Sequence, residues 1–183
     1  MKLIFATSNQ NKIDEVKRIT NLEIEGTSLE IEEIQSLDPV KVAVEKAKAY
    51  FNELKTPLLV EDTSLSFNGL GGLPGPYIND FAKALGNNGL IELLQNRDNR
   101  RAVAQVTFAL ILDENTIHTF EGKVEGVITN EEKGKNGFGW DPIFIPTGSD
   151  KTFAEMQDSE KDRYSMRAKA LALLQEFLLA NPL

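Results

Sequence analysis

Apolar residues in the first third of the chain follow two spacings in turn, and these predict strands and helices. Short apolar runs at residues 2–6 and 58–60 are typical of buried strands. Between them, Ile13, Val16 and Ile19 recur at helical spacing, and Asp38-Pro39 has the cap and first-turn residues of a second helix. The acidic stretch Leu22–Glu33 is expected to form edge strands. The pattern predicts an α/β protein.

The middle of the chain has the pattern of two long strands joined by a hairpin turn. Residues 102–112 and 117–128 read as the strands, and 113–116 as the turn. Such a pair within an otherwise βαβ chain implies a long mixed β-sheet flanked by helices. Helices are also expected at 78–85, at 90–94 and from 158 to about 180, the last with a break near Tyr164-Ser165.

Length and composition narrow the function. The 183 residues suit one domain, which we expect to span 1–183 with two lobes. The absence of cysteine excludes thiolate zinc sites and cysteine nucleophiles, and the single histidine, His118, reads as a half-exposed strand residue. Any metal must therefore be held mainly by oxygen ligands, which favours Mg²⁺, Mn²⁺ or Ca²⁺.

The net charge and the apolar runs argue against a nucleic-acid-binding, membrane-spanning or secreted protein. A net charge of −8 makes nucleic acid a poor partner, although a small anion bound with a divalent cation remains possible. The apolar runs are too short to span a membrane, and the N-terminus lacks the features of a signal peptide. We expect a cytoplasmic protein.

A pair of acids, Glu61 and Asp62, follows the strand at 58–60 and precedes a loop rich in glycine and proline. Ligands of α/β proteins bind at the carboxyl ends of strands, so Asp62 is the first candidate for a catalytic carboxylate. The alternative is a solvated acid before a plain surface loop. Within that loop, Gly69–Pro76 is interpreted as a wall close to the site or to a second subunit.

A polar turn, Thr7-Ser8-Asn9-Gln10-Asn11-Lys12, lies between the first strand and the first helix. A helix N-terminus directs free N–H groups and a positive dipole at its ligand, preferably a phosphate. Lys12 is locally unfavourable there unless an anion is bound. The alternative is a surface turn with a solvated lysine.

The stretch Lys133–Pro142 carries Phe138, Gly139, Trp140 and Asp141. Two aromatic rings beside a carboxylate form a platform for a flat base, which aromatic faces stack for about 1–3 kcal/mol each. The carboxylate can accept a ring N–H. The alternative is a hydrophobic plug under a loop.

Four separated segments together resemble the inosine triphosphate pyrophosphatases, which remove deaminated purine nucleotides. They are Thr7–Lys12, Val60–Thr63 with Gly71–Pro76, Phe138–Pro142, and Lys161 with Ser165-Met166-Arg167. The resemblance implies a fold of two lobes with a central cleft, and a homodimer. It also implies hydrolysis of ITP, dITP and XTP to the monophosphate and pyrophosphate with Mg²⁺, with Mn²⁺ as the alternative metal.

The resemblance assigns roles to individual residues. Asp62 would be the general base, and Glu33 and Asp62 the metal ligands. The remaining residues would contact the substrate. The triphosphate would be bound by Thr7, Ser8, Asn9, Gln10, Asn11, Lys12 and Lys46, and Thr63 would line the site. The base would be bound by Phe138, Gly139, Trp140, Asp141, Lys161, Met166 and Arg167. Arg167 would donate to the 6-keto oxygen that adenine lacks.

Two departures and two rival functions stay open. Met166 stands where the family has histidine, and methionine packs against a ring without donating a hydrogen bond. Asn79 stands where animal-like members often have lysine, and Lys83 could replace it. The rivals are a Maf-like pyrophosphatase of other base specificity and a nucleotide-binding module without turnover, for which the carboxylates at 33 and 62 are unnecessary.

Overall fold

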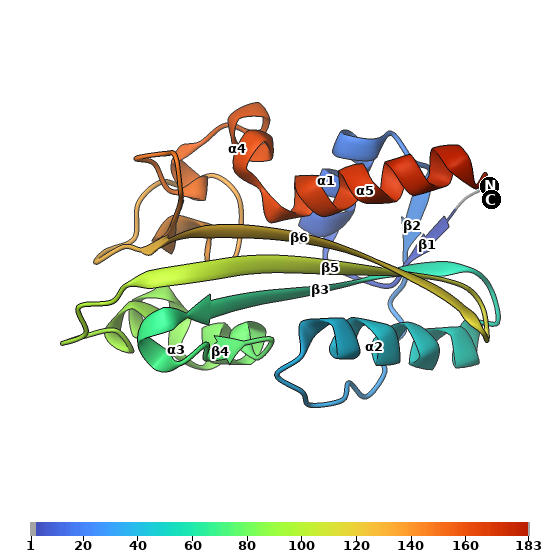
Figure 1. Ribbon diagram of the computed structural model, residues 1–183, viewed down its shortest axis with the longest axis horizontal. Helices are drawn as coiled ribbons and strands as arrows, with labels where there is room; N and C mark the ends of the chain where they lie inside the picture. The colour runs from blue at the N-terminus through green and yellow to red at the C-terminus, as the bar shows by residue number, and fades with distance from the viewer. Residues whose placement is uncertain (1–2, 183) are drawn as a thin grey trace. The chain divides into compact units, whose positions relative to one another are not determined.

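The computed structural model describes residues 3–182, within which seven strands form one mixed sheet (Figure 1). The strand order is β2-β1-β3-β5-β6-β7, with β4 paired to β3. β1 is parallel to β2 and β3, whereas β4 is antiparallel to β3 and β7 to β6. The strands are β1 (Leu3–Phe5), β2 (Ile24–Gly26), β3 (Leu58–Phe67), β4 (Pro74–Gly75), β5 (Arg101–Asp113), β6 (Thr116–Ile128) and β7 (Phe144–Pro146). The predicted mixed α/β sheet is confirmed.

The helices begin close to the predicted residues. They are α1 (Gln10–Thr20), α2 (Pro39–Leu54), α3 (Ile78–Glu92), α4 (Asp158–Tyr164) and α5 (Met166–Ala180). Asp38 caps α2 as predicted. The helix at 158 has Gln157 in the cap position, and Asp158 and Ser159 lie inside the helix. No helix within residues 3–182 is long and apolar enough to cross a membrane.

β3 is longer than the sequence pattern predicts. The apolar run at 58–60 is only its start, and the strand continues to Phe67. Glu61 and Asp62 therefore lie inside the strand, and their predicted place at its C-terminal end is wrong. The reason is that four consecutive polar residues, at 61–64, are all buried. A strand covered on both faces does not alternate, so buried polar side chains resemble the end of a strand.

Contacts divide the chain into two compact units. Unit 1 takes its residues from Met1–Asp62, Val106–Gly122 and Arg167–Leu183, and unit 2 from Thr63–Gln105 and Lys123–Met166. β3, β5 and β6 each contribute residues to both units. The single domain of two lobes stays a prediction.

In unit 1, α2 lies on one face of the strands, and α1 and α5 lie on the other (Figure 1). The α2 face is packed with apolar side chains: Ala43, Ala47, Tyr50 and Phe51 from α2, Leu58 and Val60 from β3, Ala109 and Ile111 from β5, and Ala6. On the other face, α1 buries Ile13 and Val16, two of the three residues whose spacing predicts it.

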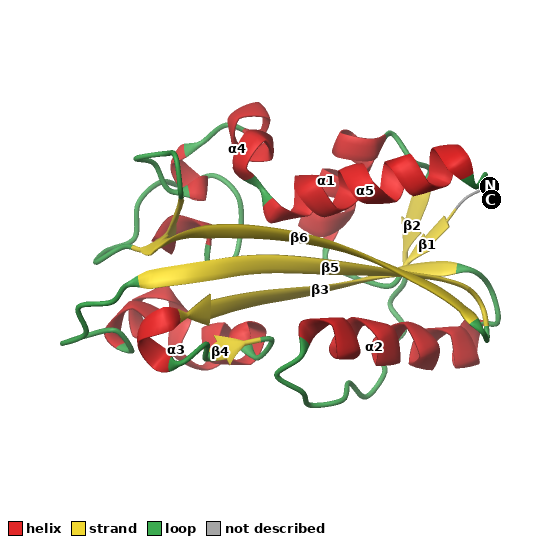
Figure 2. Cartoon of the chain, viewed as in Figure 1, coloured by secondary structure: helices red, strands yellow, loops and turns green. Residues whose placement is uncertain are grey.

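The acidic stretch after the first helix forms less sheet than predicted. β2 covers only Ile24–Gly26, and the chain from there to α2 is loop (Figure 2). Leu29 and Ile31 of this loop pack against the α2 core, and the Tyr50 hydroxyl donates to the Leu29 carbonyl at 2.9 Å. Side-chain contacts with α2, and not strand pairing, therefore hold this loop in place.

Two breaks interrupt helical regions near the residues where the sequence predicts them. In unit 2, Gly86 has φ 67° and ψ 178°, which divides α3 into two segments, as expected from the glycines at 86 and 89. Ser165 has φ −65° and ψ 131°, which separates α4 from α5. The predicted break near Tyr164-Ser165 is confirmed.

Candidate functional site

Glu61 and Asp62 are adjacent on β3, and successive side chains of a strand point to opposite faces. Val60 packs in the α2 core, so Asp62, two residues on, faces α2. Glu61 faces the opposite side, where it contacts Lys12 of α1. Two neighbouring acids thus enter two different environments, each within unit 1.

Asp62 is an acid held in an unusual state. It is 6% exposed, and its Oδ2 has no hydrogen-bond partner among residues 3–182. Burial raises the pKa of this carboxyl to about 7, against the opposing charges of Lys46 and Lys12. A carboxyl with a pKa near neutrality is suited to accept a proton from water, and an unpaired carboxylate oxygen is suited to bind a cation.

Lys46 and Glu33 form an ion pair in the surroundings of Asp62. Lys46 lies on α2 and is mostly covered, whereas Glu33 lies on the loop before α2 and is exposed. Both act on the pKa of Asp62, which Lys46 lowers and Glu33 raises. Within the described residues, no group of three acids or histidines could hold a metal alone. Two carboxylates fit Mg²⁺ only together with other ligands, such as waters and substrate phosphates.

The N-terminus of α1 has the features expected of an anion site. The Asn9 side chain caps the helix, accepting from the backbone N–H groups of Asn11 at 3.1 Å and Lys12 at 3.4 Å. The Thr7 hydroxyl accepts from the backbone N–H of Asn9 at 3.1 Å. The first turn contains no acid, so nothing in it opposes a bound anion.

A buried network of charges covers the face of β3 opposite Asp62. The Arg167 guanidinium donates to both carboxylate oxygens of Glu61, at 2.8 and 3.0 Å, and also to Glu15. The Lys12 ammonium lies 2.9 Å from Glu61 Oε1. Such a bidentate contact between arginine and a carboxylate is among the strongest hydrogen-bonded pairs in proteins.

Both central groups of this network stay charged. Burial would raise the pKa of Glu61, but Arg167 and then Lys12 outweigh it and hold the pKa well below its usual range. Burial would lower the pKa of Arg167, but Glu61 and then Glu15 outweigh burial and hold the pKa above its usual value. Arg167 was predicted to bind the base, and that role stays a prediction. Its guanidinium is engaged with two carboxylates in this structure.

Unit 2 contains a second buried ion pair, in the segment expected to hold the base. Asp141 Oδ2 accepts from the Lys161 ammonium at 2.7 Å and from the backbone N–H of Phe138 at 2.9 Å. The Lys161 nitrogen lies 5.0 Å from the centre of the half-buried Phe138 ring. A cation, a carboxylate and a ring therefore meet in one place, which offers a flat base a donor, an acceptor and a face.

Trp140 is not displayed as a second aromatic face in this structure. It is 6% exposed and packs edge-on against Phe144, with Phe153 also adjacent. This is the hydrophobic plug that the sequence left open as the alternative. Gly137 explains the tight loop: a Cβ there would overlap the Asp141 carboxylate, and its φ of +71° favours glycine.

The sequence model of the Ham1 family matches residues 3–177. The chain belongs to the Ham1 family. It is 42% identical over 176 residues to inosine triphosphate pyrophosphatase 2 of Trypanosoma cruzi, covering 94% of this chain and 90% of that protein. It is 40% identical over 179 residues to the dITP/XTP pyrophosphatase of Korarchaeum cryptofilum, covering 97% and 96%.

Ham1 structures share the fold. The Ham1 protein of Coxiella burnetii superposes with a TM-score of 0.87 at 29% identity, over 98% of this chain and 99% of that one. The Staphylococcus aureus Ham1 protein gives 0.84 at 30% identity, over 98% and 99%. The resemblance to the inosine triphosphate pyrophosphatases noted from the sequence is confirmed.

The predicted site residues of this Ham1 chain divide between the two units. Unit 1 contains Thr7, Ser8, Asn9, Gln10, Asn11, Lys12, Glu33, Lys46, Asp62 and Arg167, and unit 2 contains Thr63, Phe138, Gly139, Trp140, Asp141, Lys161 and Met166. Residues expected to bind phosphate and metal thus belong to unit 1. Most of those expected to bind the base belong to unit 2, where Met166 is buried.

Two members of the unit 1 network, Glu15 and Glu61, were assigned no role from the sequence. Glu15 lies three residues after Lys12, on the same face of α1, which is a local signal. Glu61 contacts Arg167 across 106 positions of sequence, and no local pattern reports such a contact.

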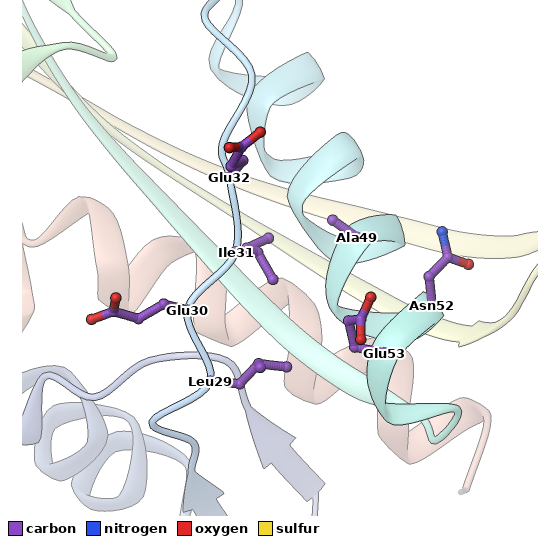
Figure 3. Close-up of a pocket in the computed structure, with 7 residues that line it drawn as sticks. All are labelled: Leu29, Glu30, Ile31, Glu32, Ala49, Asn52 and Glu53. Atoms are coloured by element: carbon purple, nitrogen blue, oxygen red, sulfur yellow. The ribbon is translucent and has the colours of Figure 1, made fainter.

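A pocket of about 430 Å³ on unit 1 contains none of the predicted site residues (Figure 3). It is lined by Leu29, Glu30, Ile31, Glu32, Ala49, Asn52 and Glu53. Leu29 and Ile31 point toward α2, whereas Glu30 points away from it (Figure 3). The lining is acidic, so the pocket is poorly suited to a triphosphate.

Proposed function

We propose that this Ham1-family protein hydrolyses the deaminated purine nucleotides ITP, dITP and XTP to their monophosphates and pyrophosphate. Its relatives include an inosine triphosphate pyrophosphatase and a dITP/XTP pyrophosphatase, which supports this substrate class. The observation that carries the chemistry is the buried Asp62 carboxyl, whose Oδ2 has no partner among the described residues and whose pKa is raised to about 7.

Unit 1 supplies the groups that the triphosphate requires. A nucleoside triphosphate carries about four negative charges, and phosphoryl transfer depends on neutralising and orienting them. Lys12, Lys46 and the N-terminus of α1 would bind the phosphates. Glu33 and Asp62 would hold Mg²⁺, or Mn²⁺, which would neutralise charge on the phosphate oxygens when bound.

The reaction needs one proton acceptor. Asp62 takes a proton from water, and the water oxygen attacks the α-phosphorus. The bond from that phosphorus to the bridging oxygen breaks, and pyrophosphate leaves with the bond's electrons. The raised pKa of Asp62 suits this role, because a general base works best when its pKa is near the working pH.

Unit 2 supplies groups that can distinguish the base. A 6-keto purine presents an acceptor at O6 and an N–H at N1, whereas adenine presents the opposite pattern. Asp141 can accept a hydrogen bond from the N1–H group, and the Lys161 ammonium beside Phe138 can donate one to O6. A site built to pair a polar group rejects an analogue that leaves it unpaired. The donation from Arg167 to O6 stays a prediction.

A substrate panel tests the proposal. Pyrophosphate release with Mg²⁺ is measured for ITP, dITP, XTP, GTP, ATP and pyrimidine triphosphates. We expect ITP, dITP and XTP to be preferred, and Asp62→Asn to lower kcat by about 10²–10⁴. Asp98→Asn, at an exposed acid in the loop before β5, is the matched control and should keep wild-type turnover.

The same panel separates the rival functions. Preference for pyrimidine or methylated nucleotides would favour a Maf-like activity, and binding without turnover would favour a nucleotide-binding module. Equal turnover of ATP and ITP would contradict the base preference, and full activity of Asp62→Asn would contradict the general base. The cytoplasmic location and the homodimer stay predictions.

A further inference from the structure

We propose that Glu61 is a positioning residue of the phosphate site. Arg167 anchors Glu61, and Glu61 holds the Lys12 side chain where it meets the triphosphate. The inference deepens the proposed function and rests on it, because it takes a triphosphate as the ligand. It assigns Glu61 and Arg167 a role that operates through Lys12.

The first observation is that Lys12 is held at both ends. Its backbone N–H lies in the first turn of α1, under the Asn9 cap. Its ammonium lies 2.9 Å from Glu61, and its side chain is 16% exposed. A free lysine side chain loses rotamer entropy when it is ordered. Lys12 is already ordered before any ligand arrives, and it is still accessible to one.

The second observation is that Glu61 is held more firmly than Lys12. Arg167 donates to both oxygens of Glu61, and Glu15 accepts from the far side of the same guanidinium. The Glu61 and Arg167 side chains are 1% and 3% exposed. The position of the Lys12 ammonium is therefore set by a carboxylate that has little freedom to move.

The third observation is that Glu61 has two cationic partners. It contacts both Lys12 and Arg167, and Arg167 also contacts Glu15. Removing one partner from a buried ion pair is costly, because a buried charge is left uncompensated. When the Lys12 ammonium turns to a phosphate, Glu61 keeps both hydrogen bonds from Arg167. Lys12 can exchange its partner without leaving Glu61 unpaired.

A double-mutant cycle tests the inference. Glu61→Gln, Lys12→Gln and the double variant are compared with wild type for binding of inorganic tripolyphosphate with Mg²⁺, measured by calorimetry, and for KM and kcat with ITP. We expect Glu61→Gln to weaken tripolyphosphate binding about 10-fold, and less than about 2-fold when Lys12 is already glutamine. KM should rise more than kcat falls.

Two controls separate positioning from stability. Lys17→Gln removes an exposed cation from the same helix, and combining it with Glu61→Gln should give losses that multiply. Melting temperatures report any loss of folding. Should Glu61→Gln not fold, Glu61→Asp keeps the charge, withdraws the carboxylate by one methylene group and enters the same cycle.

The outcomes are distinct. Losses that multiply in the Lys12 cycle, or no binding of tripolyphosphate by the wild type, would overturn the positioning role. Coupling between Lys12 and Glu61 in tripolyphosphate binding, with no hydrolysis of any triphosphate by the wild type, would support the positioning role and contradict the proposed function instead.

Discussion

Asp62, the proposed general base, illustrates at the scale of one residue how a buried acid suited to catalysis destabilises the protein that carries it. Its carboxyl is buried, and one oxygen has no hydrogen-bond partner among the described residues. Ionising such a group is unfavourable, which is the cause of its raised pKa. The property that suits Asp62 to accept a proton therefore lowers the stability of the ligand-free protein.

This cost predicts a pH dependence of stability. The protonated form of Asp62 is favoured by folding, so its contribution is fully present below the ordinary pKa of 3.8 and is lost as the pH rises to about 7. Asp62→Asn should therefore be more stable than wild type at pH 8 without metal, by up to about 4 kcal/mol. The gain should shrink toward pH 4.

Urea denaturation of both proteins at several pH values measures this difference. The remaining acids titrate in both proteins, so they cancel in the comparison. A gain that is constant between pH 4 and pH 8, or a loss at pH 8, would contradict the raised pKa of the Asp62 carboxyl.

At the scale of an element, α1 and α2 begin with the same kind of side-chain cap but differ in what else the cap does. Asn9 accepts from the N–H groups of Asn11 and Lys12, and Asp38 accepts from those of Val40 and Lys41. Only the α1 cap lies at the proposed phosphate site. The two caps form a natural comparison between a structural role and a combined role.

We expect Asn9→Ala and Asp38→Ala each to lower the free energy of unfolding by about 1 kcal/mol, the usual loss for a removed cap. Asn9→Ala should also raise KM for ITP, whereas Asp38→Ala should leave KM unchanged. Chemical denaturation and steady-state kinetics on both variants provide the measurement. An equal change in KM for both would indicate that the cap of α1 acts only through stability.

Helix starts and breaks were predictable from sequence because their signals are local. The Asn9 and Asp38 caps and the break at Ser165 each depend on a few neighbouring residues. The length of β3 was missed, and the burial of Trp140 was left open as an alternative, because each depends on what covers the residue from elsewhere in the chain. The partnership of Glu61 with Arg167 was missed for the same reason.

At the scale of the whole molecule, the predicted ligands of the two ends of a nucleotide belong to different units. The residues predicted to bind phosphate and metal are in unit 1, including Lys12 and Asp62, and most of those predicted to bind the base are in unit 2, including Phe138 and Asp141. Binding by each unit can therefore be examined separately, with the triphosphate part of the substrate for unit 1 and the nucleoside part for unit 2.

Hydrogen exchange with the two halves of the substrate tests this division. Inorganic tripolyphosphate with Mg²⁺ should slow exchange in α1 and in the first half of β3. Inosine should slow exchange in residues 133–146 and in α4. At about ten times its Kd, each ligand should slow exchange of the amides it protects about tenfold. Equal protection of both units by either ligand would contradict the division.

The adjacency of Glu61 and Asp62 on β3 also restricts how this protein can evolve. Insertion or deletion of one residue in β3 before the pair would exchange the faces of the two acids, so that Asp62 would face Arg167 and Glu61 would face Lys46. Changes of length in this part of the chain are therefore confined to the loops that flank β3, such as residues 55–57 between α2 and β3. Substitution can vary β3, but its length and register must be inherited unchanged.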